Sequence, residues 1–453
     1  MVCFTHGLEN DFTSGELFSN MYIASIEIKG ICCFDQIRID FKANDNVIQV
    51  GTILGDNGTG KTTILRSIAM GLCDKPGAIG LLQELYGDWI NGKKQEGTIR
   101  IEFFDKDSKS HQKAPYVERI FSRTPSGNVE IKKDKTFPDP FPWDDIFVCG
   151  YGAARSAFGT KDYREYAAVD SLYTLFNYDA QLQNSELIIR RISDIDYSLS
   201  NEPGVRPEDV RLLDSILKWF DRVLDLPEGS TQLSKSGISV SGPWGKFMPQ
   251  GSLGDGYRAT IAWLSDLLGW ALFYDEKMFE SEISGIVLID EIEQHLHPSW
   301  QRKIVRLLNQ QFPKIQFIFT THSPLVASNS AKLSGDDISS KLFHLHYAGE
   351  YSELSEVEEN IGELNLDQIL SSEAFDYIFD INPNINNVLR EASILAAKDS
   401  VTEAEKLKLN KFKEVLKGIM FPQGRSLIER IVERDYYKEL EKNVETFNRI
   451  LKQ

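Results

Sequence analysis

The chain has 453 residues, of which 42% are hydrophobic and 26% are charged, and this is enough to bury the cores of two or three compact units. Its formal net charge of −17 excludes a surface that coats nucleic acid along its whole extent, because such binding depends on neutralising phosphates with Lys and Arg. The five cysteines show no metal-ligand or redox spacing, no apolar run reaches membrane-spanning length, and the N-terminus does not resemble a signal peptide, so we expect a cytoplasmic protein with reduced thiols and no membrane partner.

Residues 21–155 are predicted to form the first part of an α/β domain. Residues 1–20 carry no clear pattern, and we expect them to be peripheral. The segment 99–105 alternates polar and apolar residues, which is typical of a half-exposed antiparallel strand. Apolar runs predict further strands at 23–28, 37–41 and 46–54.

A glycine-rich segment lies between the strand predicted at 46–54 and an apolar helix predicted at 63–72. It fits the phosphate-loop pattern, in which a strand, a turn and a helix aim backbone N–H groups and the positive end of the helix at one spot. Lys61 is placed to reach the β- and γ-phosphates of ATP, and the hydroxyl of Thr62 is placed to hold Mg²⁺. The predicted nucleotide-binding residues are Gly55, Asp56, Asn57, Gly58, Thr59, Gly60, Lys61, Thr62 and Thr63.

Between about residues 156 and 245 the character of the sequence changes, and we expect a helical insert. The segment 186–197 is predicted to be a helix. The segment 208–226 places a set of apolar residues on one helical face: Val210, Leu213, Leu217, Phe220 and Leu224. The insert lacks sustained heptads and is too short for a long coiled coil, so a compact helical subdomain is predicted.

Residues 246–350 are predicted to complete the α/β domain and to carry the catalytic residues. The buried strand 286–289 ends at Asp290 and Glu291; the first is suited to hold Mg²⁺ through water, and the second is placed to orient or deprotonate an attacking water. The strand 315–319 leads to His322, and a histidine at such a strand end can sense the γ-phosphate. We assign Glu291 and His322 to catalysis, although His322 alone would be interpreted as a loop histidine.

The order of these segments resembles the ABC/SMC-like ATPases, specifically their RecF- and OLD-like branch. The resemblance rests on the phosphate loop, the glycine-rich segment 251–258 before an apolar helix at 259–274, the acidic strand end, His322, and the segment 293–298 at the D-loop position. It implies an α/β fold, an ABC/SMC-type P-loop ATPase head with a helical insert and a helical C-terminal region, and pairing with a second copy. In such pairs the signature of one subunit closes over ATP held by its partner, and here the trans signature is Ser252, Leu253, Gly254, Asp255 and Gly256.

Two features depart from the family pattern. The signature serine that usually contacts the γ-phosphate aligns with Gly254, so backbone N–H groups at Gly254 and Gly256 are what remains to meet phosphate there. The segment 147–155 stands where the family has its Q-loop glutamine, and no such glutamine can be placed there. Tyr151 and Arg155 in that segment are predicted to contact the nucleotide instead.

Residues 351–453 are predicted to be a helical region for partner binding or oligomerisation. We find no Toprim Asp-x-Asp, no HNH constellation and no Ser/His/Asp or Cys/His set, so ATP hydrolysis is the one activity predicted for the chain. Its size and helical end make it resemble the ATPases of Septu anti-phage defence systems, which work with an HNH nuclease. The resemblance implies a dimer or larger assembly that acts as a switch, in which the bound nucleotide sets the state of a separate effector protein. DNA would be contacted through this complex.

Other functions stay open at this point. A RecF-like ATPase would bind DNA directly in repair or recombination, and its binding would fall steeply with salt. The segment 293–298 argues against an ATPase that serves a transporter. Nuclease activity of the chain itself is disfavoured because no nuclease centre is found in the sequence. An AAA+ module would place its acidic strand within roughly one small domain of the phosphate loop, whereas Asp290 lies 229 residues after Lys61 (290 − 61).

Overall fold

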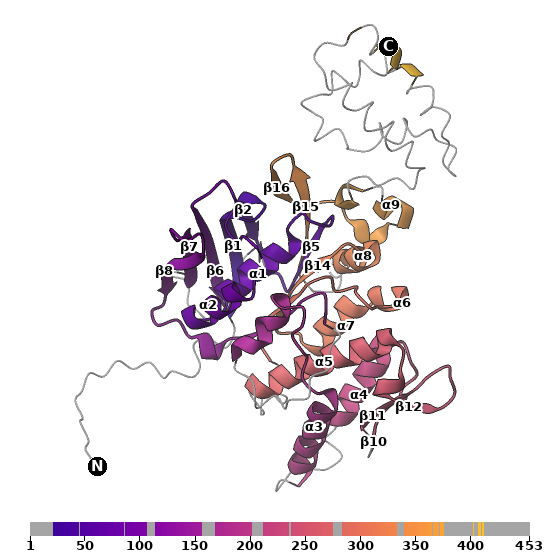
Figure 1. Ribbon diagram of the computed structural model, residues 1–453. Coiled ribbons are helices and arrows are strands. Elements are labelled where there is room, and N and C mark those ends of the chain that lie inside the picture. The colour runs from indigo at the N-terminus through magenta and orange to yellow at the C-terminus, as the bar shows by residue number, and fades with distance from the viewer. Residues whose placement is uncertain are drawn as a thin grey trace, which may run out of the picture. The chain divides into compact units, whose positions relative to one another are not determined.

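Apolar runs of the sequence form a parallel sheet in the first of two units, Met1–Leu364 and Asn365–Gln453 (Figure 1). The computed structural model describes residues 21–44, 46–85, 87–106, 114–155, 168–201, 212–234, 237–274, 283–332, 339–364, 366–370, 372–375, 402, 406–408 and 410–411. The strand order is β16-β15-β5-β14-β13-β9, and β16 runs antiparallel to its neighbour. The strands are β5 (Val50–Gly55), β9 (Phe147–Tyr151), β13 (Gly285–Ile289), β14 (Ile315–Thr321), β15 (Ser340–Ala348) and β16 (Tyr351–Glu356). β13 and β14 are buried along their whole length, as parallel strands covered on both faces require.

A second sheet is antiparallel and half exposed, with the order β2-β1-β6-β7-β8. Its strands are β1 (Met21–Ile31), β2 (Phe34–Asp40), β6 (Glu96–Asp105), β7 (Tyr116–Arg123) and β8 (Val129–Phe137). β6 buries every second residue over most of its length, which confirms the prediction made for 99–105. The strand predicted at 46–54 is instead divided into β5 and a short β4 (Asn46–Val47), which pairs with β3 (Lys42–Ala43).

Helices cover both faces of the parallel sheet. The main helices of this unit are α1 (Lys61–Gly71), α2 (Lys75–Gln83), α5 (Asp255–Tyr274), α6 (Pro298–Gln301), α7 (Ile304–Gln311) and α8 (Pro324–Lys332). Of these, α2 packs against α1 and against β8 of the antiparallel sheet. α1 and α5 confirm the helices predicted at 63–72 and 259–274, although each begins a few residues earlier. Within the segments that the structure describes, no helix combines the length and the apolarity needed to cross a bilayer.

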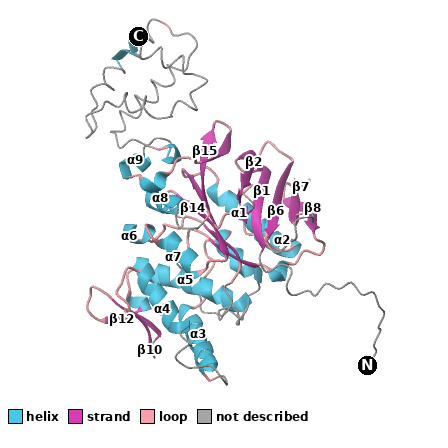
Figure 2. Cartoon of the chain, turned by 180° about the vertical axis from the view of Figure 1, so that it is seen from behind, coloured by secondary structure: helices cyan, strands magenta, loops and turns pink. Residues whose placement is uncertain are grey.

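The parallel sheet separates two layers of the core. In β13, Ile286 and Leu288 pack with α1 and the antiparallel sheet, whereas Val287 and Ile289 pack with α5 and α7. Successive side chains of a strand point to opposite faces, so a single strand serves both layers. Figures 1 and 2 show the result, with α1 between the two sheets and α5 and α7 on the other side of the parallel sheet.

The region 156–245, predicted to be a helical insert, holds strands as well as helices. After the short η3 (Ala168–Leu175), α3 (Ser185–Ser200) and α4 (Leu212–Val223) confirm the helices predicted at 186–197 and 208–226, of which 208–211 lie outside the described residues. The chain then forms β10 (Thr231–Ser234) and β11 (Gly237–Ser241), which join β12 (Phe247–Pro249) in a small sheet. The all-helical prediction is wrong here because Ile238 and Val240 of β11 complete the core under α3 and α4.

The first unit also extends past residue 350, where the sequence predicts a helical region, 351–453, to begin. That position falls inside the β15–β16 hairpin, in which Phe343 stands opposite Glu356, so this boundary is corrected to Leu364. η7 (Ile361–Glu363) packs against α8 within the same unit. The second unit contains α9 (Leu366–Leu370) and η8 (Glu373–Phe375), and most of the rest of the predicted helical region lies outside the described residues.

A buried glutamine joins the two sheets. Gln316 of β14 is 1% exposed; its Oε1 accepts a hydrogen bond from the N–H of Ile23 at 2.7 Å, and its Nε2 donates to the carbonyls of Ile23 at 3.0 Å and Ile48 at 3.1 Å. Ile23 lies at a bulge in the pairing of β1 with β6, where main-chain groups leave the regular ladder. Because unpaired polar groups in a core destabilise the fold, Gln316 fixes where the antiparallel sheet meets the parallel one.

Replacing Gln316 by Leu is expected to lower the free energy of unfolding by about 3 kcal/mol, because the main-chain groups of Ile23 and Ile48 lose their partner in a dry core. Urea denaturation followed by circular dichroism measures the change. Gln36→Leu is the matched control, since Gln36 bonds Glu27 on the exposed surface and its loss should change stability by no more than about 0.5 kcal/mol. Equal effects of the two substitutions would contradict the proposed role of Gln316.

Candidate nucleotide-binding site

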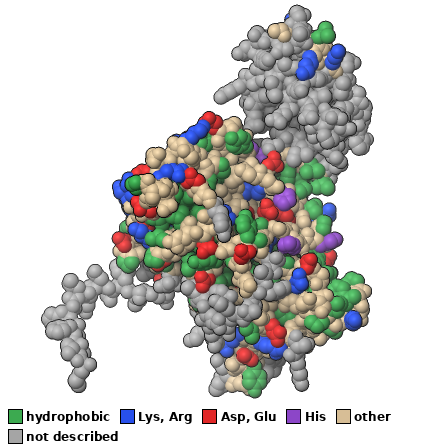
Figure 3. Space-filling model, viewed as in Figure 1, with side chains coloured by type: hydrophobic (Ala, Val, Ile, Leu, Met, Phe, Trp, Pro, Cys, Tyr) green, Lys and Arg blue, Asp and Glu red, His purple; other side chains and the backbone are tan. Residues whose placement is uncertain are grey.

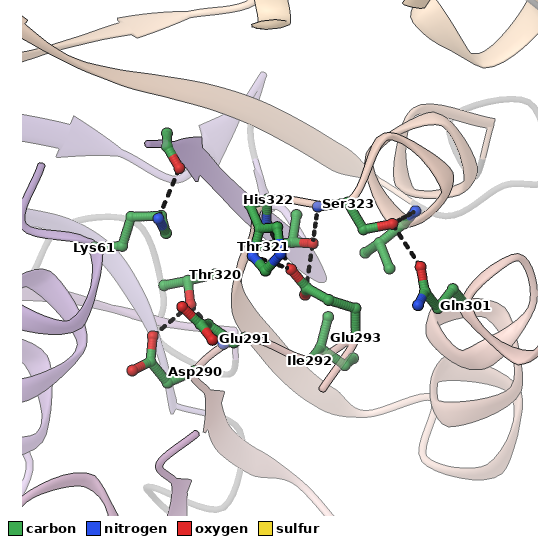
Figure 4. Close-up of polar contacts among 12 residues, drawn as sticks. Lys61, Asp290, Glu291, Ile292, Glu293, Gln301, Thr320, Thr321, His322 and Ser323 are labelled. Carbon is green, nitrogen blue, oxygen red and sulfur yellow. Dashed lines mark hydrogen bonds and ion pairs between the residues drawn. The ribbon is translucent and has the colours of Figure 1, made fainter. Parts of the chain in front are cut away.

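The parallel strands bring the predicted motifs to one edge of the sheet. The last pair between β13 and β14 is Ile289 opposite Phe319, and the last pair between β14 and β5 is Thr321 opposite Leu54. Because β5, β13 and β14 run in the same direction, the loops that follow them leave the sheet at the same edge. The phosphate loop (55–62), the acidic turn (290–293) and the histidine after β14 therefore meet there, as Figure 4 shows.

The phosphate loop has the backbone shape that anion binding needs. α1 begins at Lys61, and the N–H of Ile64 is bonded to the carbonyl of Gly60 at 3.0 Å, so the N–H groups of the preceding residues point out of the helix end without an intrahelical acceptor. Gly60 has a φ of +105°, and a Cβ there would lie 2.4 Å from Sγ of Cys33, so a glycine is required. The loop and helix end form a cradle suited to the phosphates of ATP.

Lys61 lies over this cradle. Its ammonium donates to the carbonyls of Gly55 at 2.6 Å and Asp56 at 3.0 Å. Burial lowers the pKa of Lys61, and the carboxylates of Glu291 and Asp290 oppose that effect. A bound polyphosphate would offset more of the free-energy cost of removing this cation from water.

One buried carboxylate connects α1 with the acidic turn. Asp290 is 3% exposed, and its Oδ2 accepts a hydrogen bond from the hydroxyl of Thr62 at 2.6 Å. Its Oδ1 accepts from the hydroxyl of Thr320, so both oxygens are fixed. Hydroxyl and carboxylate oxygens are the hard donors that Mg²⁺ takes together with phosphate oxygens, and Thr62 and Asp290 therefore fit such an ion.

The backbone of the acidic turn is strained at Glu291. This residue has a φ of +45°, in the left-handed region that non-glycine residues rarely occupy. Its N–H donates to the hydroxyl of Thr320 at 2.7 Å, and the same hydroxyl donates to Asp290. Strain of this kind concentrates at functional sites, where surrounding contacts hold it in place.

His322 is paired with a buried glutamate of the same turn. Its Nδ1 lies 2.8 Å from Oε1 of Glu293, which also accepts from the main-chain N–H of His322 at 2.7 Å, while Thr321 donates to the other oxygen at 2.7 Å. The hydrogen bond that His322 donates to the carboxylate of Glu293 raises the pKa of His322. Burial would raise the pKa of Glu293, but the bonds from His322 and Thr321 lower it below its ordinary value. The His322 side chain remains 58% exposed, so it can meet a ligand at this edge.

The glycine-rich segment 251–256, predicted to act on a partner's nucleotide, opens α5. Leu253 is buried, and other residues of the segment are exposed: Ser252, Gly254 and Asp255. A Cβ at Gly256 would lie 3.0 Å from the carbonyl of His295, so this segment and the D-loop segment 293–298 lie side by side. Figure 3 shows histidine and acidic side chains near one another on one face of the molecule. In the D-loop segment and after β14, the exposed histidines are His295, His297 and His322.

Tyr151 and Arg155, predicted to contact the nucleotide, have partners inside the protein instead. Tyr151 is fully buried, and its hydroxyl donates to Oδ2 of Asp266 in α5 at 2.8 Å. Arg155 is 1% exposed and donates to main-chain carbonyls of the acidic turn. The prediction is therefore wrong for both residues, because their polar atoms are used within the core beneath the site.

Thr320 and Glu293 support the site but are not among the residues that the motifs predict. A signal for Thr320 was available: a hydroxyl residue ending the strand next to β13 is placed to bond the acidic turn. Glu293 lay within the D-loop segment and gave no sign of its pairing with His322. That pairing joins the ends of two strands, and their adjacency is known only from the sheet.

The strand order, the phosphate loop and the acidic turn define the chain as a mixed α/β P-loop ATPase domain, which confirms the predicted fold class. The long spacing between Lys61 and Asp290 is filled by β6, β7 and β8 of the antiparallel sheet, by β9, by the small sheet of β10, β11 and β12, and by the helices up to α5. Residues 52–328 match the family described as "AAA domain, putative AbiEii toxin, Type IV TA system". The match spans more than half of the chain, and the chain belongs to this family of ATPase domains.

Among curated proteins, the chain is similar to two Septu proteins named PtuA, and the predicted resemblance is confirmed. It is 24% identical over 407 residues to PtuA of Bacillus mycoides (strain KBAB4), covering 87% of this chain and 50% of that protein. It is 23% identical over 333 residues to PtuA of Bacillus thuringiensis, covering 69% and 74%. A shorter stretch of 77 residues is 47% identical to the Retron Vc95 probable ATPase of Vibrio cholerae serotype O1 biovar El Tor, covering 17% and 15%. The chain thus spans half the length of the first of these relatives.

Solved structures of related architecture show a distant likeness. The SMC head domain from Thermotoga maritima is 16% identical with a TM-score of 0.40, covering 74% of this chain and 99% of that one. A structure of the recombination mediator protein RecF is 11% identical with a TM-score of 0.39, covering 75% and 99%. The fold class rests on the strand order and the family match rather than on these values.

Replacing Glu293 by Gln is expected to lower the pKa of His322 toward its ordinary value of 6.5, because glutamine carries no charge to stabilise the imidazolium. Since the pKa of His322 is raised on folding, the stabilisation from the pair is complete below about pH 6.5 and is lost as the pH rises through the folded-state pKa. An NMR titration of the His322 ring, assigned with His322→Ala, measures the shift. Glu358→Gln alters an exposed glutamate and is the control, and an unchanged His322 midpoint in Glu293→Gln would contradict the pairing.

Proposed function

We propose that the chain binds and hydrolyses ATP with Mg²⁺ and is the ATPase subunit of an anti-phage defence complex of the Septu type. The observation that carries this proposal is the convergence of the phosphate loop, the acidic turn and His322 at one edge of the parallel sheet. Mg²⁺ bound with ATP neutralises charge on the phosphates. The similarity to PtuA over 87% of the chain supports the assignment to defence.

Nucleotide binding is assigned to residues 55–63. The N–H groups at the start of α1 and the ammonium of Lys61 face the cradle and bind phosphate oxygens. Thr62 and Asp290, already 2.6 Å apart through their side chains, would hold Mg²⁺. These residues give the site its affinity for a nucleotide rather than its chemistry.

Hydrolysis is assigned to Glu291 and His322. Glu291 orients the attacking water and accepts its proton, as a carboxylate beside a transferred phosphoryl group can do. In the protonated ring of His322, Nδ1 donates to Glu293 and Nε2 is available to donate to a phosphate oxygen. The raised pKa of His322 favours this doubly protonated form.

Two copies of the chain form the complete assembly in this proposal, as a dimer or as part of a larger oligomer. The signature residues 252–256 are largely exposed at the start of α5 and would close over a nucleotide bound by the second copy. The adjacent D-loop segment 293–298 lies beside them and would enter the same interface. A Cβ at Gly254 would meet nothing within 4 Å, so the missing serine hydroxyl is not a consequence of crowding within the chain.

The effector is a separate protein, proposed to be an HNH-type nuclease, that the ATPase scaffolds and controls. Residues 351–453 are proposed to contribute to partner binding or oligomerisation. A nucleotide can control the effector only if the effector binds one nucleotide state of the ATPase more tightly than the other. We place this cycle in the cytoplasm, with DNA reached through the complex.

Lys61→Ala is expected to abolish ATP binding, because the cradle loses the ammonium that lies over it, whereas Glu291→Gln should bind ATP normally and hydrolyse it about 100-fold or more slowly. Isothermal titration and phosphate release measure these two effects. Both substitutions should also remove protection in a phage-plating assay. Lys93→Ala, which removes an exposed ion pair with Glu350, is the control and should change none of the three measurements. Full protection by both site variants would overturn the proposed function.

Affinity purification of the Glu291→Gln chain from its host with ATP and Mg²⁺ is expected to recover a stoichiometric nuclease-like protein, because blocked hydrolysis keeps the complex in one state. Mass spectrometry identifies the partner, and the ratio of ultraviolet absorbances detects nucleic acid. The Lys61→Ala chain is the matched control and should recover less of the partner. Nucleic acid without a protein partner would favour a RecF-like repair function in place of the effector.

A further inference from the structure

Arg155 is a buried arginine that bonds main-chain carbonyls. Its Nη1 donates to the carbonyls of Gly152 at 3.1 Å and Asp290 at 2.7 Å, and its Nη2 donates to those of Glu291 at 2.9 Å and Ile292 at 3.0 Å. Three of these acceptors are successive residues of the acidic turn. The planar fork of a guanidinium is suited to gather several acceptors in this way, and a lysine ammonium is not.

The bonded turn is the part of the site with the strained backbone. Glu291 lies in the left-handed region at a φ of +45°, and its own carbonyl and those on either side, of Asp290 and Ile292, are the ones that Arg155 binds. A non-glycine residue stays in this region only where its surroundings compensate the strain. On the opposite side, the N–H of Glu291 is held by the hydroxyl of Thr320. The conformation of Glu291 is therefore fixed from both sides.

Arg155 is itself held in place by its neighbours. Its guanidinium lies over the ring of Trp263 in α5, 5.6 Å from the centroid. The chain reaches it through Gly152, where a Cβ would lie 2.0 Å from the carbonyl of Thr174, so only glycine allows this path. The arginine therefore occupies a position set by the core rather than by the ligand site.

The end of β9 adds a second connection between the same elements. The carbonyl of Tyr151 accepts a hydrogen bond from the N–H of Asp290 at 2.8 Å, while its hydroxyl bonds Asp266 of α5. α5 also carries the glycine-rich segment at its start. The segment 151–155 thus links the acidic turn to the helix that bears the signature.

Charge also favours this arrangement. Burial lowers the pKa of Arg155 to about 10, and the carboxylates of Glu293, Asp290 and Glu291 oppose that effect. The guanidinium is therefore a cation at neutral pH and balances part of the negative charge of the acidic turn. Lys61 provides positive charge to the same carboxylates from the phosphate loop.

We propose that Arg155 is a positioning residue for ATP hydrolysis, which holds the turn from Asp290 to Ile292 so that the carboxylate of Glu291 stays directed at the terminal phosphate. The inference rests on the proposed function of the site. Arg155 does not touch the nucleotide and acts through the backbone of Glu291. Its loss should therefore affect the rate of the chemical step much more than the affinity for ATP.

Arg155→Met is expected to lower kcat for ATP hydrolysis about 10- to 100-fold while KM and the Kd for ATP change by less than about threefold. Arg155→Lys keeps the charge but cannot gather the same carbonyls, so its kcat should lie between those of the Met variant and the wild type. Amide hydrogen exchange of residues 290–293 should become faster in the Met variant, because the turn loses its fixed conformation. If the Met variant does not fold, the Lys variant supplies both measurements.

Arg119→Met is the matched control. Arg119 is also fully buried and donates to main-chain carbonyls, those of Met70 and Cys73, away from the acidic turn. Its replacement should lower stability and leave the hydrogen exchange of residues 290–293 unchanged. In the Glu291→Gln background, Arg155→Met should cause no further loss of kcat, because the two residues act as a unit.

The outcomes separate this inference from the function on which it rests. A wild-type chain that binds ATP without hydrolysing it would contradict the proposed function, and the exchange of residues 290–293 would still decide the role of Arg155. Unchanged exchange in the Met variant, or a kcat equal to that of the wild type, overturns the inference. Equal losses in kcat and in ATP affinity would also overturn it, because they indicate a general disturbance of the site.

Discussion

The site depends on keeping the carboxylates of Asp290, Glu291 and Glu293 together at the end of a buried strand. Each ion that is left unpaired in the interior costs several kcal/mol because it loses its water, and neighbouring charges of the same sign repel one another as well. The protein meets this cost with hydroxyls on Asp290, a histidine on Glu293, and cations on two sides. Of these three residues, only Glu291 is partly exposed.

The layers of the fold serve this arrangement. Parallel strands carry the phosphate loop, the acidic turn and His322 to a common edge, because each loop follows a strand of the same direction. The alternating side chains of β13 bind the sheet to α1 on one face and to α5 on the other. Gln316 joins the antiparallel sheet to β14, an inner strand of the parallel sheet, and so fixes the position of one sheet relative to the other.

The connection of α5 with the acidic turn gives the proposed switch a physical route. α5 begins with the exposed glycine-rich segment, and further along it contacts Arg155 through Trp263 and Tyr151 through Asp266. Those two residues bond the backbone of the acidic turn. In the proposed assembly, a change at the surface of α5 on closure with a second copy would reach the carboxylate of Glu291 through packed and hydrogen-bonded groups.

The sequence by itself was sufficient to predict the α/β class, most of the strands and the phosphate loop with its helix. These features depend on short stretches whose geometry follows from local residue order, such as a glycine-rich turn before α1 or the alternation in β6. It was not sufficient for β10 and β11, because the burial of Ile238 and Val240 against α3 and α4 depends on how these elements pack together. The predicted domain boundary at residue 350 was wrong for the same reason, because β16 lies beyond it and pairs with β15.

Only the tertiary structure decided which side chains support the site. Arg155 and Glu291 are 136 residues apart, and the sequence analysis placed Arg155 at the nucleotide, whereas the fold directs its guanidinium to the carbonyls of the acidic turn. Glu293 and His322 become partners because β13 and β14 are neighbours, a fact that no local pattern contains. Motifs record the chemistry that a short segment can perform by itself. The partners that hold such a segment in position depend on packing between distant parts of the chain, and the sequence specifies that packing only through the complete fold.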